Sequence, residues 1–442
     1  MKKYLSLCLF LLFLLSGPPI VQAAVPQNNL FVDEHANIKP IFPLTLHGII
    51  SEQLSRHMYA SDRFSNITSQ VILDASGEVS EGFHYRVSGR FSYDPVYDSK
   101  DYSVNAASDE RLQVDIRDTY IDYSKGPWDI RLGKQQIVWG DAVGSFVADI
   151  VNAKDYRQNI LPDFDQVRIP EWGADVEYSK DHFHAEAFII PAPEFDKGGV
   201  DGAEFAVPLP VPPGVTFTTV DPKKPYGFSD AKAGARVSYL IGGFDLGAFY
   251  VYSWTHAPVA FRTINAGGDF DFDPQYKRLN SFGGSFSKEV GDAVISGEFV
   301  FNKNDYFSAL DINDSDGVTK SDDLIYALGV DKTFFEKVNV GVQFFQKVIF
   351  DYQESFYNDR QVSNGASFRI QRDFLNKKIE AEFLMLASLN SPDFLYRPSL
   401  RYNIDSHWQA KIGMDVFAGD PTNPFGYYKS RSRYFIIFVD KF

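Results

Sequence analysis

The sequence has almost no cysteine. Its single cysteine, Cys8, lies inside the apolar stretch near the start of the chain, and none follows it. A framework of disulfide bonds and a metal site built from thiolates are therefore both excluded for everything after residue 8. The chain has to hold its shape by other means.

Long apolar runs are also absent after the first residues. Residues 4–15 are apolar but too few for a helix that spans a bilayer. Lys2 and Lys3 precede them, and Val21, Gln22 and Ala23 place small residues where a signal peptidase cleaves. This order predicts a secretory signal peptide at residues 1–23, and no transmembrane helix is expected after it.

Basic residues are the minority, and the formal charge is −15. That sign disfavours a nucleic-acid partner. The mean hydropathy of −0.21 is that of a soluble protein. Yet aromatic residues reach 16% of the chain, with 40 Phe and 24 Tyr. A membrane barrel combines polar lumen residues, apolar lipid-facing residues and aromatic girdles, whereas a soluble β-sandwich also alternates. Composition leaves both open.

Alternation with a period of two residues recurs along the chain. Between residues 83 and 93, for example, Phe83, Tyr85 and Val87 share one face while His84 and Arg86 share the other. We interpret eighteen such segments as strands: 44–57, 67–76, 83–93, 111–123, 128–139, 169–179, 182–191, 231–241, 244–255, 278–289, 292–304, 323–334, 337–350, 366–374, 379–389, 395–404, 408–418 and 432–442.

The connections between these segments differ in length by parity. Every second one is a tight turn, such as Gly242-Gly243 or Lys180-Asp181, and most of the others are long. The long ones are 94–110, 140–168, 192–230, 256–277, 305–322, 351–365 and 419–431. Outer-membrane barrels sort their connections in this way, and a sandwich has no reason to do so.

The predicted fold is therefore all-β, a closed antiparallel transmembrane β-barrel of about 18 strands at residues 44–442. Merging the least regular strands would give 16. Residues 24–43 form a short periplasmic N-terminal segment, too short for a plug domain. This prediction places the protein in the outer membrane of a Gram-negative cell, with outer-membrane lipid and lipopolysaccharide as its surroundings.

The C-terminus carries an aromatic alternating strand that ends at Phe442. Such an end resembles the signal that the barrel-assembly machinery binds, which makes that machinery an expected partner. Asp440 departs from the pattern, because that position is usually apolar.

The connection 140–168 is unusually apolar for a loop in water, with Phe146, Val147, Ile150, Val151 and Leu161. We expect it to fold against another part of the chain. The third extracellular loop of general porins folds into the lumen and narrows it, and this resemblance implies that 140–168 is a pore-constricting loop.

Charged residues flank this connection on both sides. Basic strand residues could face loop carboxylates across a constriction and select solutes by charge. The same charges equally fit a solvated lumen face in which ion pairs only hold the loop. The candidate pore-lining residues are Arg86, Arg90, Asp115, Arg117, Arg131 and Gln135 of the strands, and Asp141, Asp149, Asp155, Arg157, Asp163 and Asp165 of the loop.

One segment resembles a known family. Residues 131–141 read RLGKQQIVWGD, and residues 149–155 read DIVNAKD. This combination is similar to an uncharacterised porin-like family of Gram-negative outer-membrane β-barrels, domain of unknown function family 1302. The resemblance implies the location and the fold and leaves the cargo open.

The sequence thus favours a channel for passive passage of small hydrophilic or amphipathic solutes, without a cofactor and without enzymatic activity. One alternative is a specific conduit for a hydrophobic or anionic cargo, working with an export or uptake system. Another is an outer-membrane enzyme. His84 and Ser88 share a strand face but lie about 13 Å apart, beyond hydrogen-bond reach, so the enzyme is disfavoured.

Overall fold

The computed structural model describes residues 44–442 except for several short gaps, and residues 44–442 form one compact unit. The predicted signal peptide and N-terminal segment, residues 1–43, lie outside the described residues, as does Asp141. The gaps are 60–62, 100, 141, 143–145, 207–215, 266, 268, 310, 312–313 and 357–359.

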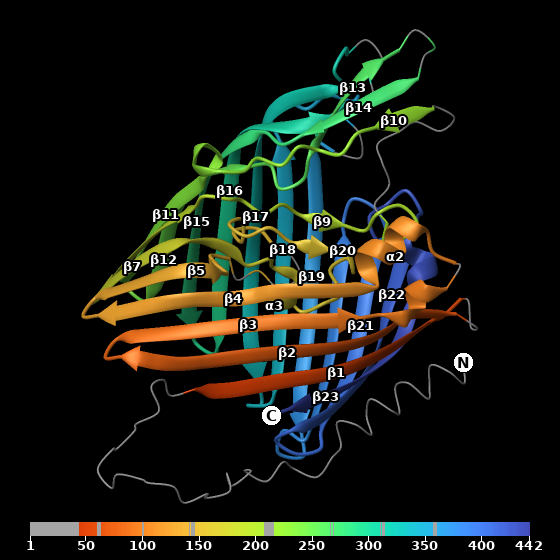
Figure 1. Ribbon diagram of the computed structural model, residues 1–442. Coiled ribbons are helices and arrows are strands. Elements are labelled where there is room, and N and C mark those ends of the chain that lie inside the picture. Colours follow the sequence, from red (N-terminus) through yellow and green to blue (C-terminus); the bar gives the residue numbers. More distant parts are fainter. Residues whose placement is uncertain are drawn as a thin grey trace, which may run out of the picture. The chain divides into compact units, whose positions relative to one another are not determined.

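Eighteen strands form one antiparallel sheet (Figure 1). Their bounds are β1 (Thr45–His57), β2 (Phe64–Ser80), β3 (Phe83–Tyr93), β4 (Leu112–Lys125), β5 (Trp128–Gln135), β7 (Glu171–Lys180), β8 (Phe183–Ile190), β11 (Lys232–Ile241), β12 (Phe244–Trp254), β15 (Arg278–Val290), β16 (Ala293–Ser308), β17 (Val318–Phe334), β18 (Val338–Ile349), β19 (Val362–Phe374), β20 (Ile379–Ser388), β21 (Asp393–Asn403), β22 (Trp408–Gly419) and β23 (Arg433–Lys441).

The sheet closes on itself. Each strand pairs with the next along the chain, and β23 pairs with β1, from Ile49 opposite Lys441 to His57 opposite Arg433. Phe442 exchanges two backbone hydrogen bonds with Gly48, at 2.8 and 3.0 Å. The prediction of a closed barrel with 18 strands is confirmed, and the alternative of 16 is wrong because no strands merge. Closure leaves no sheet edge, which a lipid environment requires.

The faces of the strands alternate as the sequence predicts. On β4 the apolar side chains of Leu112, Val114 and Ile116 are exposed on the outside of the barrel, whereas Arg117 points inward and is buried. The outside therefore presents an apolar band, and the inside carries most of the charged groups. In the described part of the chain, no helix has the length and apolar character needed to cross a membrane.

Several predicted strand ends differ from the structure by a few residues, and two of these differences move a tight turn or redirect the chain. The segment predicted at 128–139 leaves the sheet at Gln135, because the chain turns into the barrel there. The strand predicted at 67–76 extends to Ser80, since β2 continues to pair with β3 through Gly77 opposite Tyr85, and the tight turn lies at residues 81–82. Neither difference changes the number of strands.

The long connections all emerge at one end of the barrel and carry the remaining short elements (Figure 1). β6 pairs with β9 in parallel, and β10, β14 and β13 form a small separate sheet. The elements are η1 (Pro95–Asp98), α2 (Val104–Glu110), β6 (Asp155–Tyr156), α3 (Phe164–Val167), β9 (Lys197–Gly198), β10 (Phe217–Thr219), η2 (Phe228–Asp230), β13 (Val259–Ile264), β14 (Phe270–Gln275) and η3 (Gly426–Arg431).

Candidate functional site

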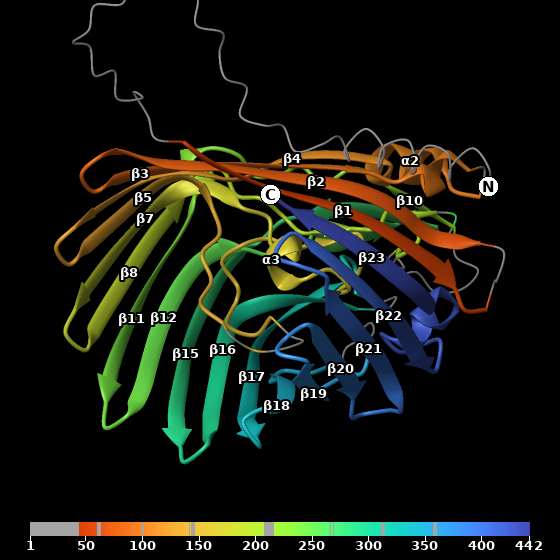
Figure 2. The same ribbon diagram turned by 90° about the horizontal axis from the view of Figure 1, so that it is seen from below.

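The connection between β5 and β7, residues 136–170, folds into the barrel and is called the inner loop below. Ala148 and Val151 pack in one apolar cluster with inward-facing side chains of β8, β12 and β16. Leu161 packs in another cluster with Leu386 of β20, Leu395 of β21 and other side chains on that side. The inner loop therefore crosses the interior between two parts of the wall, and Figure 2 shows α3 inside the ring of strands.

Two glycines allow the chain to leave the wall. Gly133 near the end of β5 has φ +140°, and a Cβ atom there would lie 2.4 Å from the Thr119 carbonyl oxygen. At Gly140 a Cβ atom would lie 2.6 Å from the Asp149 backbone nitrogen. Only glycine fits both the backbone conformation at the first position and the close approach at the second. These contacts explain why glycine occurs at position 133, in the segment Gly-Lys-Gln, and at position 140, after Trp139.

Asn152 joins the two ends of the inner loop. Its side chain is fully buried. The Asn152 Oδ1 accepts a hydrogen bond of 2.7 Å from the Ile137 backbone nitrogen, and Nδ2 donates to the carbonyls of Ile169 and Gln135 at 3.0 and 3.3 Å. A buried amide with all these partners ties the loop into one conformation, because leaving any of them unpaired is costly.

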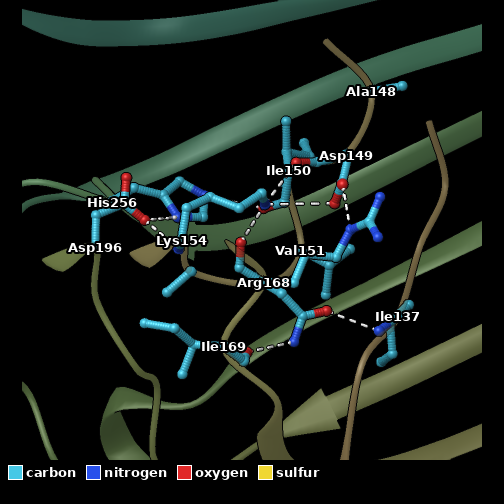
Figure 3. A network of polar contacts seen from close by, with 12 residues as sticks. Ile137, Ala148, Asp149, Ile150, Val151, Lys154, Arg168, Ile169, Asp196 and His256 are labelled. Carbon is cyan, nitrogen blue, oxygen red and sulfur yellow. Dashed lines mark hydrogen bonds and ion pairs between the residues drawn. The ribbon is translucent and has the colours of Figure 1, made fainter. Parts of the chain in front are cut away.

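Asp149 lies at the centre of an ionic network inside the inner loop (Figure 3). Its carboxylate is 2.5 Å from Arg168 Nε and 3.4 Å from Lys154 Nζ. The Lys154 ammonium group also donates to the Asn152 carbonyl at 2.5 Å and lies 4.9 Å from the Phe146 ring centre. Burial lowers the pKa of Lys154, while the Asp149 carboxylate opposes that shift. The network pairs buried charges within one loop.

The same network reaches the two following long connections (Figure 3). The Asp196 carboxylate accepts a hydrogen bond of 2.7 Å from the Lys154 backbone nitrogen and lies 3.6 Å from His256 Nδ1. His256 Nε2 lies 2.9 Å from the Ile150 carbonyl oxygen. Burial raises the pKa of Asp196, but the hydrogen bonds and charges of His256 and Lys154 together outweigh burial and hold that pKa below its ordinary value.

A buried ion pair attaches the inner loop to the wall. Glu171 begins β7 and Lys232 begins β11, and their side chains lie 2.6 Å apart without contact to solvent. The Glu171 carboxylate also accepts hydrogen bonds from the backbone nitrogens of Ala153 and Glu194, and Lys232 donates to the Val151 carbonyl. Both charged side chains of this pair therefore also bind backbone groups of the loops.

Three of the predicted arginines also hold the inner loop. Arg90 of β3 pairs with Asp115 at 2.8 Å and donates to the Gln166 carbonyl. Arg117 of β4 donates to the carbonyls of Asp165 and Arg168 at 2.6 and 2.9 Å. Arg157 pairs with Asp155 at 2.6 Å and donates to the Asp109 carbonyl. All three guanidinium groups are buried.

The other predicted residues are spread more widely. Arg86 pairs with Asp74 of β2 at 2.6 Å and remains half exposed. The Arg131 guanidinium lies 4.5 Å from the Tyr120 ring centre. Gln135 is buried beside the inner loop, and its carbonyl accepts from Asn152. Asp165 Oδ2 accepts from its neighbour Gln166, and Asp163 is exposed before α3.

A cavity of about 370 Å³ lies between the inner loop and the wall formed by β20 to β23. Apolar and charged side chains both line it. The lining comprises Val138, Gly140, Ala142, Ile160, Pro162, Asp163, Phe164 and Arg168 of the inner loop, and Glu382, Leu384, Leu386, Arg397, Ser399, Lys411 and Phe435 of the wall.

Most charges of this cavity are paired. Arg397 lies 2.9 Å from Asp415 and donates to the Leu161 carbonyl at 2.6 Å. Glu382 lies 2.7 Å from Arg369. For the Lys411 ammonium group and the Asp163 carboxylate, in contrast, no hydrogen bond or ion pair is found among the described residues.

The sequence analysis missed the wall side of this cavity. Lys411 occupies the polar face of the strand predicted at 408–418, so its inward orientation was available from the alternation. Asn152 and Glu171 carry a weaker signal, a polar side chain within an apolar stretch. In the described residues, no group of three His, Asp or Glu side chains is arranged to hold a metal ion.

A comparison with protein families finds one match. The model of a family described as "Protein of unknown function (DUF1302)" matches residues 59–326, a range that includes the whole inner loop. A comparison with curated proteins finds no match.

Solved structures of the same architecture include three outer-membrane proteins from two bacteria. OccAB1 of Acinetobacter baumannii has a TM-score of 0.54 at 9% identity, covering 90% of this chain and 96% of its own. The outer membrane protein opdK of Pseudomonas aeruginosa has 0.50 at 10%, covering 90% and 98%. Pseudomonas aeruginosa OccK2 (OpdF), solved in complex with glucuronate, has 0.50 at 10%, covering 90% and 97%. At such identities the likeness is one of fold, a porin-like outer-membrane barrel.

Proposed function

The chain belongs to the DUF1302 family, whose function is unknown, and we propose that it is an outer-membrane channel for passive passage of small hydrophilic or amphipathic solutes. The signal peptide at residues 1–23 would export it. Lipid and lipopolysaccharide would surround the apolar band, and the barrel-assembly machinery would bind the strand that ends at Phe442. The short turns would then face the periplasm.

One observation carries this proposal. The inner loop crosses a closed barrel and leaves a cavity of about 370 Å³ against β20 to β23. A loop that fills part of a lumen narrows it without needing a plug domain, so size and charge at the remaining opening decide which solutes pass. Gradients drive such passage, and no cofactor takes part in it.

The charged groups divide into two tasks under this proposal. Arg90 and Arg117 hold the inner loop against the wall and Arg157 holds it against α2, because their donors already point at carbonyls and carboxylates. Asp155 is paired with Arg157, and Asp149 is paired with Arg168 and Lys154 of the same loop. Selection of solutes falls instead to the side chains of the cavity.

The apolar part of the cavity lining supports amphipathic as well as hydrophilic solutes. Ile160, Phe164, Leu384, Leu386 and Phe435 would contact the apolar part of a solute and release water from it. OccK2, a neighbour of the same fold, was solved with glucuronate, a small hydrophilic anion. We propose solutes of comparable size here.

Planar bilayers test the channel directly. The purified protein should give discrete conductance steps. A single cysteine at the cavity, Ser399→Cys, should react with a charged methanethiosulfonate reagent and lower the conductance, because Ser399 lines the cavity. The matched control is Ala381→Cys, opposite the exposed Leu400 on the outer face of β20 and β21. It should not respond.

Two outcomes would contradict this function. One is the absence of steps at every applied voltage, which would mean a closed barrel. The other is equal block of both cysteine variants, which would mean that ions do not pass through the cavity beside the inner loop.

A further inference from the structure

Two opposite charges face the cavity without a hydrogen-bond or ion-pair partner among the described residues, and the Lys411 ammonium group lies 6.0 Å from the Phe435 ring centre. Lys411 projects inward from β22, and Asp163 precedes α3 on the inner loop. Within the described residues, neither side chain forms a hydrogen bond or an ion pair. Both side chains line the same cavity.

The other charged side chains that line the cavity already have protein partners. Arg168 is bound to Asp149, Arg397 to Asp415 and the Leu161 carbonyl, and Glu382 to Arg369. The Asp149 carboxylate is shared with Lys154 and the Asp415 carboxylate with Arg433, and each of these groups loses its bonds if it turns toward a solute. Lys411 and Asp163 are therefore the cationic and the anionic group that a solute in the cavity can bind.

Part of the cavity lining near these two groups is apolar. Ile160 and Phe164 belong to the inner loop, and Leu384, Leu386 and Phe435 belong to the wall. The cavity volume of about 370 Å³ corresponds to about a dozen water molecules at roughly 30 Å³ each. Water against such side chains is readily displaced by an apolar group of similar size.

We propose that this cavity is a binding subsite for small amphipathic zwitterions, with a carboxylate at Lys411, an ammonium group at Asp163 and an apolar body against Phe164, Leu384 and Phe435. This inference rests on the proposed channel function and specifies its solute class. A simple anion would leave Asp163 facing like charge, and a simple cation would do the same to Lys411. An uncharged hydrophilic solute would leave the apolar side chains in contact with water.

Three molecules of nearly the same shape separate these alternatives. Leucine carries both charges, 4-methylpentanoate has only the carboxylate, and 3-methylbutylamine has only the ammonium group. Binding to the full-length protein in detergent at pH 7 can be followed by saturation-transfer NMR. We expect leucine to bind about tenfold more tightly than either analogue, which is the effect of one charge-assisted hydrogen bond.

Substitutions then assign each charge. Lys411→Gln should weaken leucine about tenfold and should not weaken 3-methylbutylamine, because the substitution removes a like charge. Asp163→Asn should weaken leucine and should not weaken 4-methylpentanoate, for the same reason. The matched controls are Lys347→Gln, a lumen lysine that stacks on Phe307, and Asp165→Asn, a loop carboxylate outside the cavity. Neither control should change leucine binding.

The outcomes separate this inference from the channel itself. Equal binding of leucine and both analogues, or an equal loss in the variants and their controls, would overturn the zwitterion subsite even if conductance steps are present. Leucine binding that depends on Lys411 and Asp163, in a protein that shows no conductance, would support the subsite and contradict the channel.

Discussion

The two sides of the barrel hold the inner loop in different ways. On the side of β3 to β11, here called the attachment side, the guanidinium groups of Arg90 and Arg117 and the ammonium group of Lys232 donate to loop carbonyls. On the side of β20 to β23, the cavity side, the loop makes apolar contacts through Leu161 and one hydrogen bond to Arg397.

This difference separates two roles that look alike in a sequence. A buried charge with several partners is committed to structure, because it loses that stabilisation when it turns toward a solute. A charge at a cavity without a partner can respond to a solute. Most of the basic residues that hold the loop lie on the attachment side. On the cavity side, Lys411 lines the cavity and has no hydrogen bond or ion pair among the described residues.

Breaking the buried pair of the attachment side should have the largest effect. Lys232→Met leaves the Glu171 carboxylate buried without its cation and removes the donor to Val151. We expect the free energy of unfolding to fall by about 3–5 kcal/mol. Urea unfolding of the protein in lipid vesicles measures this value.

The double variant Glu171→Gln with Lys232→Met is the control, since it removes both charges and should recover part of the loss. A loss in the single variant below about 1 kcal/mol would mean that the pair is solvated and does not hold the loop.

Removing one basic residue on each side sharpens the comparison. Arg117→Ala should loosen residues 146–170, seen as faster hydrogen exchange, because two carbonyls lose their donor. It should change the reversal potential in a salt gradient only slightly. Lys411→Gln should do the opposite, shifting the reversal potential toward cations without faster exchange.

Equal shifts of the reversal potential in the two variants would contradict this division of roles. A reversal potential that shifts as much with Arg117→Ala as with Lys411→Gln would place the selective field on the attachment side, as the charge pattern of the sequence first suggested.

The fold was predictable because the strands of a closed barrel produce a repeating pattern in the sequence. Lipid on one side and lumen on the other force alternation at residues such as Phe83 to Tyr93, and closure with short turns forces the parity of the connections. The pattern failed at 136–139, where Ile137 and Trp139 still alternate. Their apolar side chains meet Phe188 and Phe249 inside the barrel, and alternation does not distinguish that surface from lipid.

The site was less predictable, for a physical reason. The sequence shows that Arg90 and Arg117 are charged. It does not show which backbone carbonyls accept their hydrogen bonds, because every residue carries a carbonyl. Lys411 and Asp163 are brought to one cavity only by closure of the whole barrel. Spacing along the chain therefore carried no sign of their proximity.

The smallest expected effect concerns the hydrogen bonds of Glu110 on the attachment side, here called the clasp. Glu110 of α2 is buried, and its carboxylate accepts a hydrogen bond of 2.6 Å from the Tyr97 hydroxyl. Gln158 Nε2 of the inner loop lies 3.5 Å from the same oxygen. Burial raises the pKa of Glu110 from 4.5 to about 7, although the Tyr97 hydrogen bond opposes the shift.

The sign of the pH dependence follows from that direction. Between pH 4.5 and about 7 the folded state binds this proton more firmly than the unfolded state does, so the stabilisation is complete at low pH and is lost as pH rises through that range. We therefore expect residues 94–111 to exchange amide hydrogens faster at pH 8 than at pH 5, after correction for intrinsic rates. Glu110→Gln, which stays neutral, should abolish the difference, whereas Asp109→Asn next to it should not. A pH dependence that survives in Glu110→Gln would assign the titration to another group and leave the clasp on the attachment side independent of pH.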